Sequence, residues 1–256
     1  RKVASHQPDL VVWPETATPF YFLADRRNTE TLLREVQELK KPLLFGSPAY
    51  RRKGERVRLY NRAYLLNDRG VIVGFYDKIH LVPFGEYVPL KRLLFFVDKL
   101  AQAAGASGEQ AVVMDVSPAK VGVLICYEAI FPELSRNLVN GGANLLVNIT
   151  NDAWFGRSSA PYQHLSMAVF RSVENRVPMA RCANTGLSAF IDAQGRILQV
   201  SSLFQDATLF STLHLGNEKT FYTRYGDWFA WSCLAITLLV FAFSLLKAGI
   251  SKESET

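Results

Sequence analysis

The stretch VGVLICYE, residues 121–128, is an apolar run that ends in a short polar group beginning at Cys126. Two other apolar runs end in the same way, LVVWPE at Glu15 and VIVGFYDK at Lys78. Short runs of this kind are typical of strands that are buried within a sheet. The sequence therefore predicts a sheet protein in which three strand ends carry a thiol, a carboxylate and an ammonium group.

These three groups suit acyl transfer through a thioester. A cysteine thiol is only slightly ionised at neutral pH, so Glu15 is the candidate base that takes its proton and later returns it to a leaving group. The carbonyl oxygen that gains negative charge needs fixed donors, and Lys78 and the backbone N–H of Tyr127 are the candidates. The alternative for Cys126 is an inert buried thiol, because cysteine is among the most buried residue types. A single Glu or Lys is otherwise usually a solvated surface residue.

Apolar runs of strand length alternate with helical patterns over residues 9–200, which predicts a layered α/β domain with buried strands. The helical pattern at residues 31–41 places Leu32 and Val36 on one face. The basic segment RRKGER, residues 51–56, is expected to be a solvated turn between strands, with contact to anionic lipid headgroups as an alternative. The expected strands cover residues 9–13, 42–47, 57–67, 71–78, 112–117, 121–128, 144–150, 178–186 and 187–200, and further helices are expected at 131–142 and 161–176.

Composition narrows the class of protein. The chain has 256 residues, 49% of them apolar, and a net charge of +6. The basic residues are scattered and no zinc-finger or ribonucleoprotein signature accompanies them, so no nucleic-acid partner is expected. The other cysteines, Cys182 and Cys233, form no CxxC or Cys/His cluster with Cys126, so neither a metal nor a disulfide is predicted. Cys182 is expected in the core and Cys233 on a lipid-facing or packing surface.

The C-terminal end differs in composition. From Trp228 to Leu246 no residue is charged, and at ~1.5 Å rise per residue this stretch crosses most of a ~30 Å hydrocarbon layer. We therefore expect a transmembrane helix, with a buried core helix as the alternative. Trp228 lies at one boundary, while Lys247 and Lys252 follow the other. The positive-inside tendency then predicts a short cytoplasmic tail and a large domain on the outer side of the membrane.

Several ordered blocks resemble the nitrilase, or carbon–nitrogen hydrolase, superfamily, and within it the membrane branch of apolipoprotein N-acyltransferases. The blocks are WPE, DKIHLVPFGEYVP, CYEAIFPE, NDAWFG and the pair Gln163-His164, followed by the terminal apolar stretch. The resemblance runs from Asp9 to the tail. It implies an αββα sandwich of nitrilase type, followed in this chain by one C-terminal transmembrane helix. It also implies that the sandwich lies on the periplasmic face of a bacterial inner membrane, where several transmembrane helices of the parent protein carry it.

The resemblance also implies a reaction. A cysteine takes an acyl chain from a phospholipid, typically phosphatidylethanolamine, and the thioester then acylates the α-amine of a lipoprotein's diacylglyceryl-cysteine. Glu15 resembles the family's general base, Lys78 its oxyanion-stabilising lysine and Cys126 its nucleophile. No cofactor is implied. Hydrolysis of a small amide by the same three residues is the alternative activity, and a membrane-tethered binding domain is the alternative from another class.

The resemblance extends to supporting residues. Glu86 matches a second essential glutamate, Tyr127 and Glu128 match the residues after the nucleophile, and Trp154 matches an active-site tryptophan. Each has a structural alternative: Glu86 as a turn cap, Glu128 as the partner of an Arg or Lys, and Trp154 as a packing aromatic. His164 is expected to be a hydrogen-bonded structural histidine.

Three expectations concern organisation. Residues 1–222 are predicted to form the catalytic domain and residues 223–256 the membrane helix, at about 228–246, with its tail. The apolar segment 81–97 is expected to pack on the domain or to act as a mobile lid that admits lipid. By comparison with the family, the first strand and the helices upstream of it are expected to lie outside this sequence, which begins at Arg1.

Overall fold

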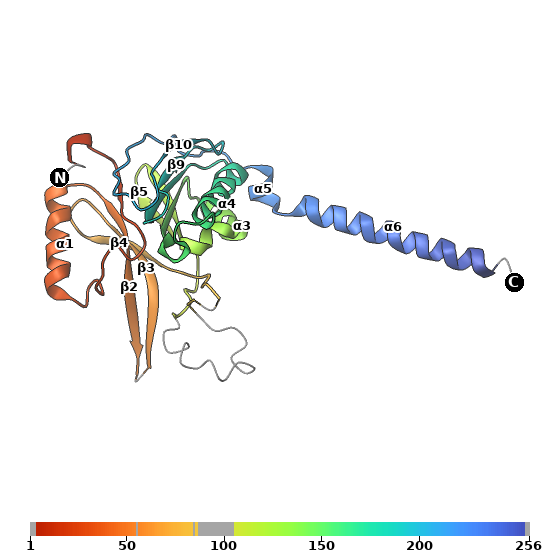
Figure 1. Ribbon diagram of the computed structural model, residues 1–256, viewed down its shortest axis with the longest axis horizontal. Helices are drawn as coiled ribbons and strands as arrows, with labels where there is room; N and C mark the ends of the chain where they lie inside the picture. The colour runs from red at the N-terminus through yellow and green to blue at the C-terminus, as the bar shows by residue number, and fades with distance from the viewer. Residues whose placement is uncertain (1–3, 55, 84, 87–104, 254–256) are drawn as a thin grey trace.

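Two sheets packed face to face, with helices on their outer sides, make up the main body of the protein (Figure 1). The structure is a computed structural model that describes residues 4–54, 56–83, 85–86 and 105–253. The predicted lid at 81–97 therefore lies mostly outside the described residues. Helix α6, Trp228–Glu253, projects away from the body (Figure 1).

The first sheet has the strand order β1-β2-β3-β4. Strand β1 pairs in parallel with β2, and the remaining neighbours are antiparallel. A tight turn joins β3 to β4, because the Asn67 side chain accepts hydrogen bonds from two backbone N–H groups and Gly70 has φ +74°. The strands are β1 Val11–Val12, β2 Leu43–Lys53, β3 Arg56–Leu66 and β4 Ile72–Asp77.

The second sheet has the order β10-β9-β8-β7-β6-β5. Its three central strands, β6, β7 and β8, run parallel, and antiparallel strands flank them on both sides. The strands are β5 Val113–Val116, β6 Ala119–Ile125, β7 Leu145–Asn151, β8 Met179–Asn184, β9 Ala189–Ile191 and β10 Ile197–Val200. Because β6 and β7 are parallel, the polar residues that follow them lie at the same edge of the sheet.

The helices begin and end at recognisable signals. Asp25 caps α1, and Pro132 opens α3 in its first turn. Thr220 caps α5, whose buried Thr223 hydroxyl donates to Asn175 at the end of α4. The helices are α1 Arg26–Leu39, α3 Pro132–Asn140, α4 Ala160–Asn175, α5 Phe221–Tyr225 and α6, with 3-10 turns at Ala4–His6, Cys126–Ile130 and Asp152–Phe155.

Three apolar layers hold the body together. One lies between the sheets and contains Leu65 and Val123. A second lies between α1 and the first sheet, and a third lies between the second sheet and the helices α3 and α4. This layering is the predicted αββα sandwich.

The bounds of two predicted segments differ in the structure. The run at residues 9–13 forms only a two-residue strand, and Trp13 after it is 38% exposed. Hydrogen bonds to β2 continue beyond this strand, since the Pro14 carbonyl accepts from the backbone N–H of Gly46 at 3.2 Å. The segment 51–56 is the exposed connection between two strands that was predicted, but the turn is shorter than expected, since β2 continues to Lys53 and β3 starts at Arg56. The Arg51 guanidinium donates to the Asp77 carboxylate at 3.0 Å, so part of this segment is held against the sheet.

Helix α6 is the one helix among the described residues that is long and apolar enough to cross a membrane, over Trp228–Leu245. None of this span is buried inside the protein. Cys233 is exposed along it, as the sequence indicated. An apolar helix with no apolar surface against it fits lipid better than water.

Candidate active site

Cys126 lies directly after β6, where the chain turns into the 3-10 segment Cys126–Ile130. Its φ is +54°, which is uncommon for any residue other than glycine. A sharp turn of this kind after a buried strand lifts one side chain out of the sheet edge. Cys126 is half-buried and packs against the edge of the apolar layer between the two sheets.

Glu15 lies after β1 and is held in a defined position. Its Oε1 accepts a hydrogen bond from the Asn61 side chain at 2.6 Å, and its Oε2 accepts one from the backbone N–H of Asn151 at 2.7 Å. Gly46 allows the close approach of this segment, because a Cβ there would lie 2.7 Å from the Glu15 Cα. Burial raises the pKa of the carboxyl, and the Lys78 ammonium partly opposes that rise.

Lys78 follows β4 and is only 1% exposed. Its Nζ lies 2.8 Å from Glu86 Oε1 and 3.9 Å from Glu15 Oε1, so one ammonium lies between two carboxylates. Burial works against the charge, but Cys126, Glu15 and Glu86 together raise the pKa of Lys78. Glu86 is in turn fixed, because its Oε2 accepts from the backbone N–H of Val82 at 2.8 Å.

The thiol of Cys126 lies within electrostatic range of both Glu15 and Lys78. Burial and the Glu15 carboxylate raise its pKa to about 11, while Lys78 and a hydrogen bond with the Thr150 side chain lower it. A neutral thiol beside a carboxylate whose own pKa is raised is the arrangement expected for proton transfer between the two. The structure thus brings the three predicted strand-end residues into one cluster.

Glu128 takes a different role from the ion pair with Arg or Lys that was considered. It is fully buried, and its Oε1 accepts from the Tyr76 hydroxyl at 2.6 Å and from the backbone N–H of Ile79 at 2.7 Å. Its Oε2 accepts from the backbone N–H of Ile125 at 2.7 Å. Burial raises the pKa of this carboxyl, and these hydrogen bonds oppose the rise. Glu128 therefore ties the segment after Lys78 to the turn that carries Cys126.

The two predicted aromatic residues lie in different surroundings. Tyr127 is half-buried and its ring makes an edge contact with Phe131, with centroids 5.2 Å apart. Trp154 is 85% exposed in the 3-10 turn Asp152–Phe155, so the interpretation as a packing aromatic is wrong. The neighbouring Phe155 is also exposed, and the pair forms an apolar projection from the strand end of β7.

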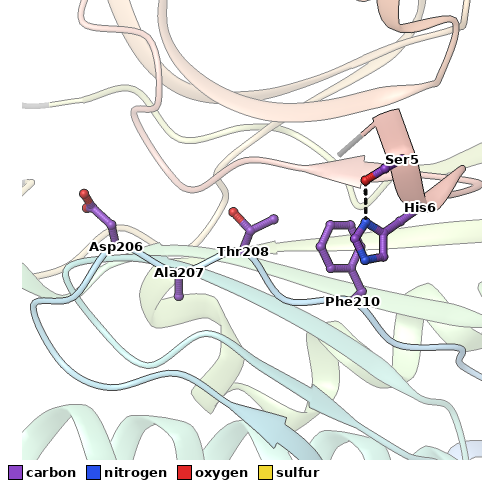
Figure 2. Close-up of a pocket in the computed structure, with 6 residues that line it drawn as sticks. All are labelled: Ser5, His6, Asp206, Ala207, Thr208 and Phe210. Carbon is purple, nitrogen blue, oxygen red and sulfur yellow. Dashed lines mark hydrogen bonds between the residues drawn. The ribbon is translucent and has the colours of Figure 1, made fainter. Parts of the chain in front are cut away.

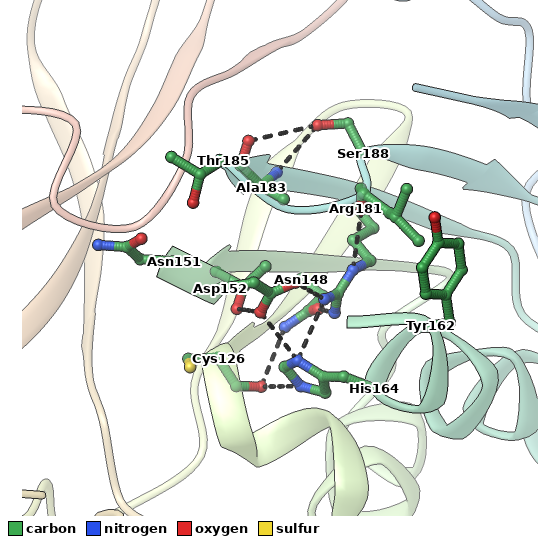
Figure 3. A network of polar contacts seen from close by, with 12 residues as sticks. Cys126, Asn148, Asn151, Asp152, Tyr162, His164, Arg181, Ala183, Thr185 and Ser188 are labelled. Atoms are coloured by element: carbon green, nitrogen blue, oxygen red, sulfur yellow. Dashed lines mark hydrogen bonds and ion pairs between the residues drawn. The ribbon is translucent and has the colours of Figure 1, made fainter. Parts of the chain in front are cut away.

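Sequence reasoning missed a buried polar cluster beneath the thiol, which consists of Asn148, Asp152, His164 and Arg181 (Figure 3). His164 is buried and hydrogen-bonded, as expected for a structural histidine. Its partners were not anticipated. Arg181 lies in the apolar strand β8, and a charged residue in such a strand is the signal from which a buried ion pair could have been predicted. His164 and Arg181 hold the pKa of Asp152 below its usual value, against the effect of burial.

The described residues contain no group of three or more His, Cys, Asp or Glu side chains placed to hold a metal ion. A surface hollow of about 430 Å³ is lined by Ser5, His6, Asp206, Ala207, Thr208 and Phe210, where the rings of His6 and Phe210 stack (Figure 2). None of its lining residues is one of Glu15, Lys78 and Cys126. The candidate active site is therefore assigned from its side chains, and not from this hollow.

Comparison with known proteins gives consistent relatives. The apolipoprotein N-acyltransferase of Geobacter metallireducens is 51% identical over 256 residues, which cover 99% of this chain and 49% of that protein. The enzyme of the same name from Chlorobaculum tepidum is 34% identical over 92% of this chain and 49% of its own length. The chain thus spans about half the length of the curated relatives it matches.

Solved structures share the fold at low sequence identity. A carbon–nitrogen hydrolase from Helicobacter pylori G27 has a TM-score of 0.61 at 17% identity, over 78% of this chain and 76% of that one. An amidase mutant from Nesterenkonia sp. AN1 has a TM-score of 0.59 at 20% identity, over 79% of each chain. The family model described as carbon–nitrogen hydrolase matches residues 1–221. With its two facing sheets and outer helices, the chain belongs to the carbon–nitrogen hydrolase family.

Proposed function

We propose that this chain carries the acyl-transfer site of an apolipoprotein N-acyltransferase, in which Glu15, Lys78 and Cys126 act as base, oxyanion donor and nucleophile. The observation that carries the proposal is the half-buried Cys126 on a left-handed turn, within range of the buried Glu15 and Lys78. The 51% identity to an enzyme of that name supports the choice of reaction within the family.

The first half-reaction forms a thioester. As the Cys126 sulfur bonds to the carbonyl carbon of a phospholipid ester, the thiol proton moves to Glu15. The negative charge on the carbonyl oxygen is stabilised by the Lys78 ammonium and the backbone N–H of Tyr127. The ester C–O bond then breaks, and Glu15 returns the proton to the leaving oxygen, which departs as the alcohol of a lysophospholipid.

The second half-reaction forms an amide. The α-amine of an N-terminal diacylglyceryl-cysteine attacks the thioester carbonyl, and Glu15 takes a proton from the amine. The same two donors stabilise the second oxyanion. The C–S bond then breaks, the proton passes to the sulfur, and Cys126 is restored as a thiol. Glu86 supports both steps because it holds the Lys78 ammonium at 2.8 Å.

The substrates are proposed to reach the site from a bilayer. Helix α6 supplies the span Trp228–Leu245, and the exposed Trp154 and Phe155 offer an apolar surface suited to acyl chains. On this view residues 1–222 form the catalytic domain and residues 223–256 the membrane helix and tail. We place the domain on the periplasmic side of a bacterial inner membrane, in a parent protein with several membrane helices, and phosphatidylethanolamine is the preferred acyl donor.

Mass spectrometry of the intact protein tests the proposal. Incubation with phosphatidylethanolamine micelles should add the mass of one acyl chain at Cys126, and neutral hydroxylamine should remove it. A diacylglyceryl peptide with a free N-terminus should also discharge the adduct and become acylated. Absence of any adduct in the wild-type protein contradicts the proposal.

Amide hydrolysis is the second candidate, because the structurally similar Nesterenkonia protein is an amidase. The same three residues would serve, with water in place of the lipoprotein amine. Release of ammonia from small amides, without acyl transfer from phospholipid, would favour this activity.

A further inference from the structure

The buried polar cluster of Asn148, Asp152, His164 and Arg181 contacts the main chain of the nucleophile. No residue in the cluster is more than 6% exposed. His164 Nε2 lies 3.1 Å from the Cys126 carbonyl oxygen, and Asn148 Nδ2 lies 3.5 Å from the same atom. Four polar side chains are thus buried directly behind one peptide group.

The ring of His164 is fixed from its other side. Its Nδ1 lies 3.0 Å from Asp152 Oδ1 and 3.1 Å from Arg181 Nη2. Arg181 also donates to Asp152 Oδ2 at 2.8 Å and to the Asn148 side chain. Nδ1 therefore has a partner whether it carries a hydrogen or not, because Asp152 accepts and Arg181 donates.

The contact with Cys126 assigns the hydrogen on the remaining ring nitrogen. A carbonyl oxygen only accepts, so His164 Nε2 must be the donor in this hydrogen bond. The same nitrogen carries a hydrogen in the neutral tautomer selected by Arg181 and in the charged ring. Donation to the Cys126 carbonyl therefore does not depend on the protonation state of His164.

A peptide group is planar and trans, so its C=O and N–H bonds point in opposite directions. The Cys126 carbonyl and the Tyr127 N–H belong to one such group. Figure 3 shows the carbonyl of Cys126 directed at His164 and the sulfur directed away from it. Holding the carbonyl against the cluster therefore turns the Tyr127 N–H away from the cluster and fixes its direction.

We propose that the buried polar cluster positions the oxyanion donor of the reaction: His164, with Asn148, fixes the Cys126–Tyr127 peptide so that the Tyr127 N–H stabilises the tetrahedral intermediate. The inference rests on the proposed thioester chemistry. Hydrogen bonds to the carbonyl also polarise the peptide and strengthen the N–H as a donor. The cluster further holds Cys126 at φ +54°, a conformation that a residue with a side chain adopts only when its surroundings impose it.

Two reactions of the same thiol separate this role from simple structural support. Acylation by p-nitrophenyl butyrate passes through an oxyanion, and single-turnover release of p-nitrophenol measures it. Alkylation by iodoacetamide displaces iodide at a CH₂ group and forms no oxyanion. Neither probe needs a phospholipid, so a negative result in lipid acyl transfer leaves this test interpretable.

His164→Asn and His164→Gln form the matched pair of variants. Asn places its amide near the position of Nδ1, so it keeps a partner for Asp152 and Arg181 but does not reach the Cys126 carbonyl. Gln places its amide near Nε2 and restores that donor. The exposed His214→Gln is the control.

We expect His164→Asn to slow acylation by about 10- to 100-fold, the range for partial loss of an oxyanion donor, while alkylation changes by less than about threefold. His164→Gln should recover most of the acylation rate, and His214→Gln should match the wild type. Equal slowing of both reactions, or unchanged acylation in a folded His164→Asn protein, overturns the inference. If His164→Asn does not unfold cooperatively, the test uses the rates of His164→Gln relative to wild type instead. Equal losses of the acylation and alkylation rates in His164→Gln overturn the inference as well.

Discussion

The two sheets contribute different kinds of group to the candidate site and hold them by different means. The first sheet presents charges, Glu15 and Lys78, fixed through their side chains by Asn61 and Glu86. The second sheet presents the thiol of Cys126, fixed through its backbone by a left-handed φ and by hydrogen bonds to its carbonyl oxygen.

The reaction should therefore depend on the two sheets in different ways. The ionisation of Glu15 and Lys78 depends on burial and on neighbouring charges, so the contribution of the first sheet should change with pH and with removal of a single carboxylate. The contribution of the second sheet depends on the direction of the peptide group at Cys126, so it should change with substitutions at residues that never touch the substrate. Glu128 joins the halves, because one carboxylate on the second sheet's turn accepts from backbone N–H groups on both sides.

The largest expected effect comes from removing the group that the second sheet presents. Cys126→Ala should abolish the acyl adduct and lower turnover by about 10⁴-fold or more, since no thioester can form. Adduct mass and acylated peptide measure this directly. Cys182→Ala is the matched control, because that thiol donates its hydrogen bond to the Val12 carbonyl and is not one of the three proposed catalytic groups, and its loss should leave turnover near wild type. Acyl transfer by Cys126→Ala would show that another nucleophile acts.

Removing the base from the first sheet should have the next largest effect. Glu15→Gln retains the shape of the side chain but cannot take the thiol proton, so acylation should slow by about 10²- to 10⁴-fold. Pre-steady-state acylation is the measurement. Glu30→Gln is a suitable control, because Glu30 pairs with Arg26 on the exposed face of α1. A Glu15→Gln enzyme of normal rate would remove Glu15 from the proposed mechanism.

The sandwich was predictable from sequence because buried strands and amphipathic helices carry periodic signals. The strands containing Leu65 and Val123, and the helix face of Leu32 and Val36, lie where the patterns indicated. The predicted site residues come together because polar residues after buried strands share an edge of the sandwich. Their catalytic roles stay predictions.

The buried polar cluster was harder to predict, since its members are far apart in the sequence. His164 lies on α4 and Arg181 on β8, and only packing places both against Asp152. The lengths of β1 and β2 were also misjudged. Regular pairing of β1 ends at Val12, and pairing with β3 extends β2 to Lys53, so that the predicted turn after it is shorter than expected.

A smaller effect is expected in the pH dependence of Cys126 alkylation, because the charges that the first sheet presents act on the thiol that the second sheet presents. Burial and Glu15 raise the pKa of Cys126 from 9.0 to about 11, so the thiolate fraction grows about tenfold per pH unit up to that value. Between pH 8 and pH 10 its alkylation by iodoacetamide should therefore rise by about 100-fold, whereas N-acetylcysteine should level off as the pH passes its ordinary thiol pKa. A Cys126 rate that is already constant above pH 7 would mean that Lys78 holds a preformed thiolate, and the neutral-thiol mechanism would be wrong.

The smallest effect should come from Glu86, which acts on the reaction only through Lys78. Although burial is the largest influence on the Lys78 pKa, the Glu86 carboxylate raises it, so Glu86→Gln should lower it. Lys78 then loses its proton at a lower pH, so the decline of the acylation rate at alkaline pH should begin at a lower pH. At neutral pH the acylation rate should fall about tenfold, because the ammonium of Lys78 is held less firmly in place. Acylation rates measured across pH for this variant and for the exposed Glu38→Gln give the comparison. A fall in the acylation rate with no shift of its alkaline decline would mean that Glu86 positions Lys78 without affecting its charge. The first sheet would then control its group by position, as the second sheet does.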